Sequence, residues 1–261
     1  MIFFSVFFSS VLNRALFVFN KTNDSKRNKR ILNYFNALFH LIFPPLCCHC
    51  KKELLSDERY ICWCCDLEIQ ATFFELQSTP SSLDKLFWGR VKVNQTFALF
   101  YFKKGSVSQT ILHEIKYGHK GDLGVEMGEK MARVIMGAYS MKTIDALIPV
   151  PTHHRKTFNR GYNQSEKIAK GISNLTTIPI DNHFISKMNH TQSQTKKSNT
   201  ERWLNVNGGF GRVASNKGYQ HIAIVDDVIT TGATLEVLIK EIKKSNPNIE
   251  ISIFALAMAK K

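Results

Sequence analysis

The chain has 261 residues, a length that fits one large domain or one domain with an appendage. Its 35 lysines and arginines outnumber the 21 aspartates and glutamates, and the formal charge of +14 favours polyanionic partners such as nucleic acid, phosphorylated substrates or an acidic membrane surface. All six cysteines fall between Cys47 and Cys65, which argues against a secreted protein held together by disulfides.

Residues 1–30 are predicted to be a leader outside the folded domains. Residues 1–19 are rich in Phe, Val, Leu and Ile, but Asn13 and Arg14 interrupt the apolar run and no basic residue precedes it. The segment is therefore a poor signal peptide and a marginal membrane span. We expect a disordered leader on a cytoplasmic protein. The alternative is attachment to the periphery of the inner membrane, with the following basic cluster on the cytoplasmic side: Lys21, Lys26, Arg27, Lys29 and Arg30.

Residues 31–77 are predicted to form a small zinc-ribbon module. A helical pattern over residues 31–46 ends at Pro44 and Pro45. Two C-x-x-C pairs follow, eleven residues apart: Cys47 with Cys50, and Cys62 with Cys65. Four thiolates at this spacing predict a closed tetrahedral site for a structural Zn²⁺ ion, with no open position for catalysis. A redox-active pair is the alternative, and other ligand registers would use Cys48, His49 or Cys64.

Residues 83–261 are predicted to form a second domain, after a linker or exposed loop over residues 78–82. Its first expected elements are a strand over Thr96–Phe102, helices over Ser108–Lys116 and Leu123–Ala138, and a buried strand over Ala146–Val150. A basic loop over residues 152–164 then carries three cationic side chains: Arg155, Lys156 and Arg160. The helix after this loop is expected to bury Ile168, Ile172 and Leu175.

The stretch Ile222–Thr234 carries most of the chemistry. Residues 222–225 form a continuous apolar run, typical of a strand buried on both faces, so we predict an α/β fold with a parallel sheet covered by helices. The strand is expected to end at Asp226 and Asp227. A short loop then leads into a helix with apolar residues at helical spacing: Leu235, Leu238, Ile239 and Ile242. This order leaves backbone N–H groups open at a helix start, which favours an anion.

The loop and the two carboxylates suit different parts of one ligand. Gly232 lets the backbone approach a ligand closely, and three hydroxyls can donate to phosphate oxygens: Thr230, Thr231 and Thr234. Asp226 and Asp227 can accept from vicinal ribose hydroxyls or hold a hydrated Mg²⁺ ion. We therefore predict a sugar phosphate across the carboxyl end of the sheet. If the strands are parallel, the basic loop reaches the same end and can neutralise a diphosphate.

Three other interpretations compete with a sugar-phosphate site. A Walker B strand would need a Gly-x-x-x-x-Gly-Lys-Ser/Thr run upstream, and the chain has none. The acidic pair of a receiver domain belongs near the start of a domain. An ordinary surface turn is the third interpretation.

The same stretch resembles the phosphoribosyl pyrophosphate signature of the type I phosphoribosyltransferases, in which two acidic residues precede a loop rich in Thr-Thr-Gly. The resemblance implies that Asp226 and Asp227 contact the ribose hydroxyls. It also implies that residues 230–234, Ala233 included, wrap the 5′-phosphate.

Further motifs are similar in order and spacing to those of the ComF family, from about residue 31 to the C-terminus. They are the cysteine pairs, Lys116-Tyr117, residues 148–151 with 160–164, Gln194-Thr195, and Arg202 with Asn205-Val206. The resemblance implies a zinc-binding N-terminal module on a phosphoribosyltransferase-like domain, associated in competent bacteria with the handling of incoming single-stranded DNA. Two features depart from the family pattern. Lys196-Lys197 stands where a Gly-Leu-like pair is frequent, and neither cysteine pair is followed by glycine.

Two functions follow from these features. In the first, an enzyme linked to DNA uptake or nucleotide salvage transfers ribose 5-phosphate from phosphoribosyl pyrophosphate, with Mg²⁺ held near Asp226 and Asp227. In the second, a catalytically inactive competence factor binds a nucleotide or single-stranded DNA and works with other competence-machinery proteins. The DNA surface is expected around basic residues of two loops: Arg155, Lys156, Arg160, Lys196, Lys197 and Arg202.

Overall fold

The computed structural model of the chain describes residues 43–139, 141–152, 154–187, 210–213 and 218–260. The predicted leader, residues 31–42 of the predicted helix, and Lys196, Lys197 and Arg202 lie outside these ranges. The described residues form two compact units, 43–47 with 51–62 and 48–50 with 63–260, which are taken one at a time. Across these ranges, no helix is both long enough and apolar enough to cross a bilayer.

The first unit is a short irregular segment closed by backbone bonds. Leu46 and Glu53 form an antiparallel bridge, and the Cys47 N–H donates to the Lys52 carbonyl over 2.8 Å. Lys51, directly after the first cysteine pair, has a φ of 62°, in the left-handed region that glycine adopts with least strain. Lys51 therefore adopts the left-handed conformation at the position after the first cysteine pair, where the sequence has no glycine.

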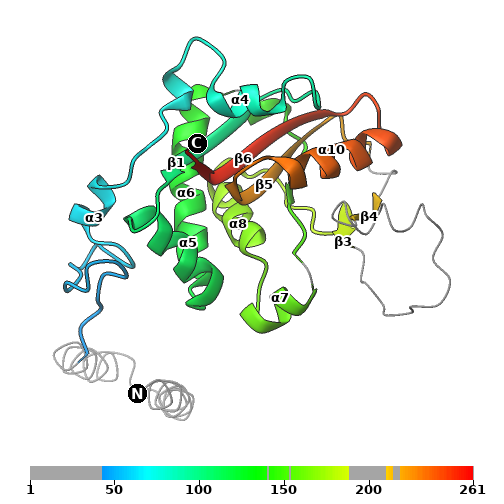
Figure 1. Cartoon of the computed structure of the whole chain (residues 1–261). Helices are drawn as coiled ribbons and strands as arrows, with labels where there is room; N and C mark the ends of the chain where they lie inside the picture. The colour runs from blue at the N-terminus through cyan, green and yellow to red at the C-terminus, as the bar shows by residue number, and fades with distance from the viewer. Residues whose placement is uncertain (1–42, 140, 153, 188–209, 214–217, 261) are drawn as a thin grey trace, which may run out of the picture. The chain divides into compact units, whose positions relative to one another are not determined.

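The second unit is built on a four-stranded parallel sheet in the order β1-β6-β5-β2 (Figure 1). The strands are β1 Thr96–Phe102, β2 Ala146–Pro149, β5 His221–Ile229 and β6 Glu250–Ala259. Residues 222–225 pair with β6 on one side and β2 on the other, and their side chains are fully buried. A central strand covered on both faces requires such an apolar run, so the predicted α/β fold with a parallel sheet is confirmed.

Three helices pack together beside this sheet: α5 Val107–Tyr117, α6 Gly121–Ala138 and α8 Gln164–Thr176 (Figure 1). Where α6 and α8 meet, only glycine fits. A Cβ added to Gly128 would lie 2.2 Å from the Ile168 carbonyl oxygen, and one added to Gly171 would lie 2.0 Å from the Val125 carbonyl oxygen. The two glycines thus determine how close α8 comes to α6, and with it where the first residues of α8 lie.

Helix α4 Ser82–Phe87 precedes β1 and makes the exposed linker shorter than predicted. The Asp84 N–H donates to Ser81 Oγ at 3.1 Å, and the Ser81 N–H donates to Asp84 Oδ2 at 2.7 Å, a reciprocal cap at the helix start. Leu83 and Phe87 are fully buried. Ser81 and Ser82 therefore belong to a capped, packed helix, although residues 78–80 are exposed as expected.

Helix α10 Ala233–Ser245 buries the four apolar residues that its periodicity singled out: Leu235, Leu238, Ile239 and Ile242. The remaining described elements are short. They are α3 Trp63–Leu67, η1 Phe74–Leu76, η2 Met141–Thr143, α7 His154–Arg160, and the antiparallel pair of β3 Ile185–Lys187 with β4 Phe210–Val213.

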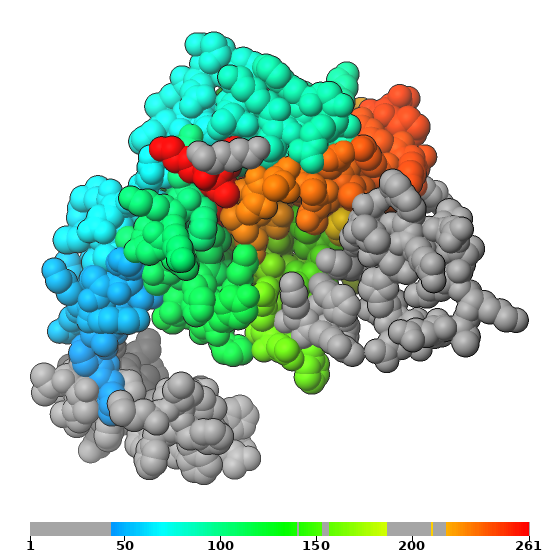
Figure 2. Space-filling model, viewed as in Figure 1, coloured from blue at the N-terminus to red at the C-terminus, as the bar shows by residue number. Residues whose placement is uncertain are grey.

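Two predictions for the second domain are wrong. The basic segment over residues 152–164 is not all loop, because it contains α7; this helix lies on the surface (light green in Figure 2), where Phe158 is 81% exposed. Leu175 is 37% exposed instead of buried, whereas Ile168 and Ile172 are fully buried. Leu175 lies in the last turn of α8, beyond the part of the helix that packs on its neighbours.

Candidate functional site

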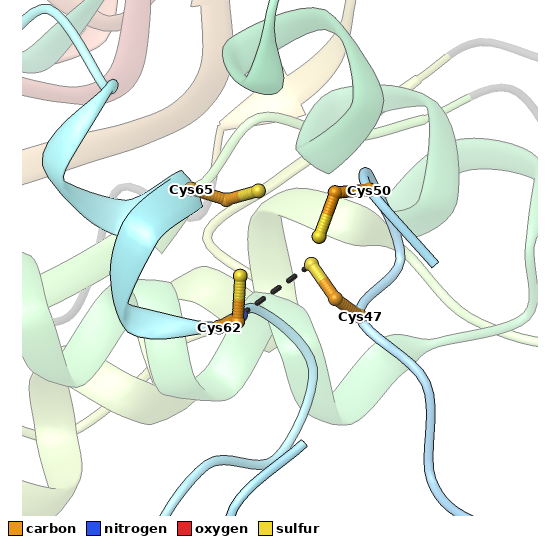
Figure 3. Close-up of side chains that lie close together, drawn as sticks. All are labelled: Cys47, Cys50, Cys62 and Cys65. Carbon is orange, nitrogen blue, oxygen red and sulfur yellow. Dashed lines mark hydrogen bonds between the residues drawn. The ribbon is translucent and has the colours of Figure 1, made fainter. Parts of the chain in front are cut away.

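The four predicted cysteine ligands come together. The sulfur atoms of Cys47, Cys50, Cys62 and Cys65 all lie within 4.8 Å of one another and point toward a common centre (Figure 3). Around an ion with Zn–S bonds of about 2.3 Å, tetrahedral sulfurs are about 3.8 Å apart, so the group fits one metal ion. Four soft thiol donors and no carboxylate suit a structural zinc. The predicted ligand set is thus the one that the structure brings together.

Two further contacts fix this ligand set. The Cys62 N–H donates to Cys47 Sγ at 3.4 Å, a bond that stabilises a thiolate (Figure 3). His49 lies between the first two cysteines in sequence, but its Nδ1 is 2.8 Å from Thr110 Oγ1 of α5. The alternative registers through Cys48, His49 or Cys64 are therefore not those of the cluster.

Asp226 and Asp227, here called the aspartate pair, lie inside β5 and not at its end as predicted. β6 is ten residues long and continues to pair with β5 as far as Ile229. On the other side, β2 ends at Pro149, opposite Val225, and the Val150 N–H makes the next bond to the Val225 carbonyl. The aspartate pair thus lies where β5 extends past β2 and has a sheet neighbour on one side only.

Asp227 is buried and Asp226 is half-buried, and both carboxylates have few compensating partners. Lys116 Nζ lies 3.1 Å from Asp227 Oδ2, and the Asp227 side chain is 6% exposed. This oxygen accepts no hydrogen bond from any residue that the structure describes. Asp226 Oδ1 accepts from the Asp227 N–H at 2.8 Å and lies 3.4 Å from Ser165 Oγ at the start of α8.

The electrostatics of the pair favour a further positive or donating group. The pKa of Asp226 is raised from 3.8 to about 7, first by burial and second by the neighbouring Asp227 charge, despite the smaller lowering by its hydrogen bonds and by Lys116. Two neighbouring carboxylates, one buried and one half-buried, therefore share one ammonium group. Hydroxyl donors of a ribose or a hydrated divalent cation would complete the arrangement, and the oxygen donors fit Mg²⁺.

Arg160 is the predicted cation whose side chain the structure describes near this end of the sheet. Its guanidinium carbon lies 5.1 Å from the centre of the Tyr117 ring, next to Lys116 in sequence, and its Nη1 donates to Gln164 Oε1 at 2.7 Å. The contact with Tyr117 is a cation–π interaction. Arg155 and Lys156 lie in α7, but their side chains fall outside the described part, so their role stays a prediction.

The loop over residues 230–234 leads from β5 into α10. Gly232 has a φ of 71° and no side chain with which to cap the helix; the Ala233 N–H makes a long bond of 3.4 Å to Thr231 Oγ1, and a helix start of this kind favours an anion. Thr230, Thr231, Ala233 and Thr234 are exposed. A Cβ on Gly232 would lie 3.1 Å from Leu86 and Phe87 of α4, which is a packing reason for this glycine in addition to the predicted approach of a ligand.

Two residues of the site were not predicted as such. Lys116 entered only through a family motif, and Ser165 was not singled out at all. Their contacts with the aspartate pair depend on how α5 and α8 pack, and the one local signal is Asn163, whose side chain caps α8 by accepting from the Ser165 N–H at 3.1 Å.

The chain is similar to named bacterial proteins. It is 35% identical to Competence protein F of Haemophilus influenzae over 123 residues, which is 46% of this chain and 53% of that protein. It is 26% identical to DNA utilization protein YhgH of Escherichia coli O157:H7 over 128 residues (48% and 56%), and 28% identical to Competence protein ComFC of Bacillus subtilis over 110 residues (42% and 43%).

The matched part spans about half the length of these relatives. No protein-family model matches the chain. The relatives' names point to the same family as the order of motifs in the sequence. The four-cysteine cluster and the parallel sheet are consistent with that family. These names support the resemblance to the ComF family over the matched half of the chain.

Proposed function

We propose that the second unit binds a phosphoribosyl ligand, either phosphoribosyl pyrophosphate or a nucleotide 5′-phosphate. The observation that carries this proposal is the under-compensated aspartate pair, in which Asp227 is buried and lies six residues before Ala233, the first residue of α10, whose N-cap Gly232 has no side chain. Carboxylates accept hydrogen bonds from ribose hydroxyls, and open N–H groups at a helix start donate to phosphate. One ligand offers both groups at this spacing.

In this proposal each part of the site has its own task. Asp226 and Asp227 hold the ribose, and the hydroxyls of Thr230, Thr231 and Thr234 with the first N–H groups of α10 hold the 5′-phosphate. Arg160, Lys156 and Arg155 neutralise a diphosphate when one is present. A magnesium ion at the aspartate pair would supply charge neutralisation for that diphosphate. The residues themselves orient the sugar, which is the larger part of what a transferase of this type requires.

For the cellular role, we propose that the chain takes part in the uptake or use of DNA. The names of its relatives, Competence protein F, Competence protein ComFC and DNA utilization protein YhgH, support this role. So does the net charge of +14, because a basic protein attracts the phosphate backbone. Whether the site also transfers its phosphoribosyl group to a base separates an enzyme from a single-stranded-DNA-binding competence factor.

The proposal is tested by isothermal titration of the full chain with phosphoribosyl pyrophosphate and Mg²⁺. Binding that disappears in the Asp226→Asn/Asp227→Asn variant supports it, and a folded wild type that binds no phosphoribosyl ligand rejects it. An assay for diphosphate release with a panel of bases then decides the activity. Release that depends on the base identifies an enzyme, whereas binding without release identifies the competence factor.

A further inference from the structure

Lys116 is the one cationic side chain that contacts the aspartate pair among the residues that the structure describes. Its Nζ is 3.1 Å from Asp227 Oδ2, the oxygen that accepts no other bond there. Asp226 is served by a backbone N–H and by Ser165 Oγ, which are neutral groups. With both aspartates ionised, the pair and Lys116 together carry one uncompensated negative charge.

The base of Lys116 is fixed, while its ammonium group is near solvent. Lys116 is in the last turn of α5, and the turn after it is closed by an ion pair of 2.9 Å between Lys120 and Glu114. Tyr117 is held by Arg160 in the cation–π contact. The Lys116 side chain is 22% exposed, against 6% for Asp227. The lysine can therefore leave the carboxylate by rotating its side chain, without moving the helix that carries it.

We propose that Lys116 is a built-in counter-cation that occupies the place of a divalent cation beside Asp227 and gives it up when a polyphosphate anion binds. This inference rests on the proposed function of the same site. It makes the metal and the anion mutually dependent. The cation binds poorly while the ammonium group is in place, and the anion that withdraws the ammonium group opens the carboxylate to the cation.

The reason is electrostatic competition at one buried oxygen. A divalent cation and an ammonium group within about 4 Å of the same carboxylate repel each other, and burial weakens the screening between them. A diphosphate carries more negative charge than one aspartate and can accept from the lysine through several oxygens. Because binding free energies are linked, the anion and the cation must increase each other's binding affinity by the same factor.

The test is Mn²⁺ binding to the full zinc-loaded chain, read by the paramagnetic resonance signal of free Mn²⁺ without any phosphate ligand. Lys116→Met keeps the length of the side chain and removes its charge. We expect this variant to bind Mn²⁺ at least about ten-fold more tightly than the wild type, since a nearby like charge is gone. Lys116→Gln should show the same gain, and circular dichroism melts establish that both variants are folded.

Two controls place the gain at the aspartate pair. Lys120→Met removes an equal charge from the same turn, but Lys120 pairs with Glu114 and should leave Mn²⁺ affinity unchanged. Adding Asp227→Asn to Lys116→Met should abolish the gain. If Lys120→Met also binds Mn²⁺ more tightly, the gain comes from the net charge alone and the proposal is overturned. Equal Mn²⁺ affinities in the wild type and both Lys116 variants would overturn it as well.

The proposed function fails on a different measurement. If the wild type binds phosphoribosyl pyrophosphate but Lys116→Met gains no Mn²⁺ affinity, only the counter-cation role is lost. If Lys116→Met gains affinity but no phosphoribosyl ligand binds the wild type, the counter-cation role stands and the ligand assignment is wrong.

Discussion

The two ends of β5 both bury polar side chains, but the two ends differ in how completely these side chains are hydrogen-bonded. At the amino end, His221 is 2% exposed, and its ring nitrogens lie 3.0 Å from Thr143 Oγ1 and 2.8 Å from Ser252 Oγ. At the carboxyl end, Asp227 is as deeply buried, yet one of its oxygens accepts no hydrogen bond from the described residues. Burial alone therefore does not mark a binding site. The difference between the two ends is the incomplete hydrogen bonding of Asp227, which is costly for a buried polar group unless a ligand completes it.

The largest expected effect comes from changing the carboxyl end. Asp226→Asn with Asp227→Asn should weaken phosphoribosyl pyrophosphate binding by roughly two to four orders of magnitude, since each charged hydrogen bond contributes on the order of 1.5 to 3 kcal/mol. The double variant should not melt earlier than the wild type, because it removes two neighbouring like charges, one of which is buried. Titration calorimetry beside a thermal melt measures both. An earlier melt with unchanged affinity would assign the aspartates a structural role.

A second way to break the carboxyl end is to displace α8, which carries Ser165 beside Asp226. Gly171→Ala places a Cβ 2.0 Å from a backbone oxygen of α6, so we expect a loss of about 3 kcal/mol in unfolding free energy and weaker ligand binding. Gly137→Ala in α6 is the matched control, because its Cβ would meet nothing within 4 Å. It should gain up to about 1 kcal/mol from helix propensity. Urea unfolding of both variants makes the comparison, and equal stabilities would refute the close packing.

Changing the amino end should lower the stability of the protein and leave ligand affinity unchanged. His221→Ala leaves the hydroxyls of Thr143 and Ser252 without their ring partner, and we expect a loss of about 2 kcal/mol in unfolding free energy. Ligand affinity at the far end of the strand should stay within about two-fold of wild type, because changes at distant sites are usually independent. His183→Ala, at an exposed histidine, is the control and should change neither quantity. Reduced ligand binding by a folded His221→Ala protein would contradict the division between the two ends.

The last effect is a difference in the pH dependence of the unfolding free energy, for which the sign of the slope is predicted. The pKa of Asp226 is raised in the folded protein from 3.8 to about 7, so its contribution to stability is present below about pH 4 and is lost as the pH rises toward 7. Burial lowers the pKa of His221 from 6.5, so its contribution is present above that pH and is lost as the pH falls.

These opposite slopes can be separated by variants. Asp226→Asn should remove the loss of stability on raising the pH, and His221→Ala should remove the loss on lowering it. Urea unfolding between pH 4.5 and 8 is the measurement, and the protonation of the four clustered cysteines cancels when each variant is compared with the wild type. The assignment is wrong if Asp226→Asn and the wild type have parallel pH profiles.

Local patterns in the sequence predicted local structure well. The apolar run over residues 222–225 and the helical spacing from Leu235 to Ile242 were confirmed, and the four predicted cysteines come together. The predicted end of β5 was wrong because the length of a strand depends on the strand beside it, and β6 continues beyond the aspartate pair. The pairing of Lys116 with Asp227 could not be predicted, since it depends on how α5 packs against the sheet.

The strand order also has a consequence for how the protein is made. β1 and β2 are synthesised first, but they form the two edges of the sheet, and their parallel partners β6 and β5 come last. While the chain is still on the ribosome, the apolar faces of β1 and β2 have no strand between them, so the sheet forms only by long-range contacts after the C-terminal segment emerges. Until β5 and β6 insert, the nascent chain exposes apolar surface and unpaired strand edges, which chaperones bind and which can lead to aggregation.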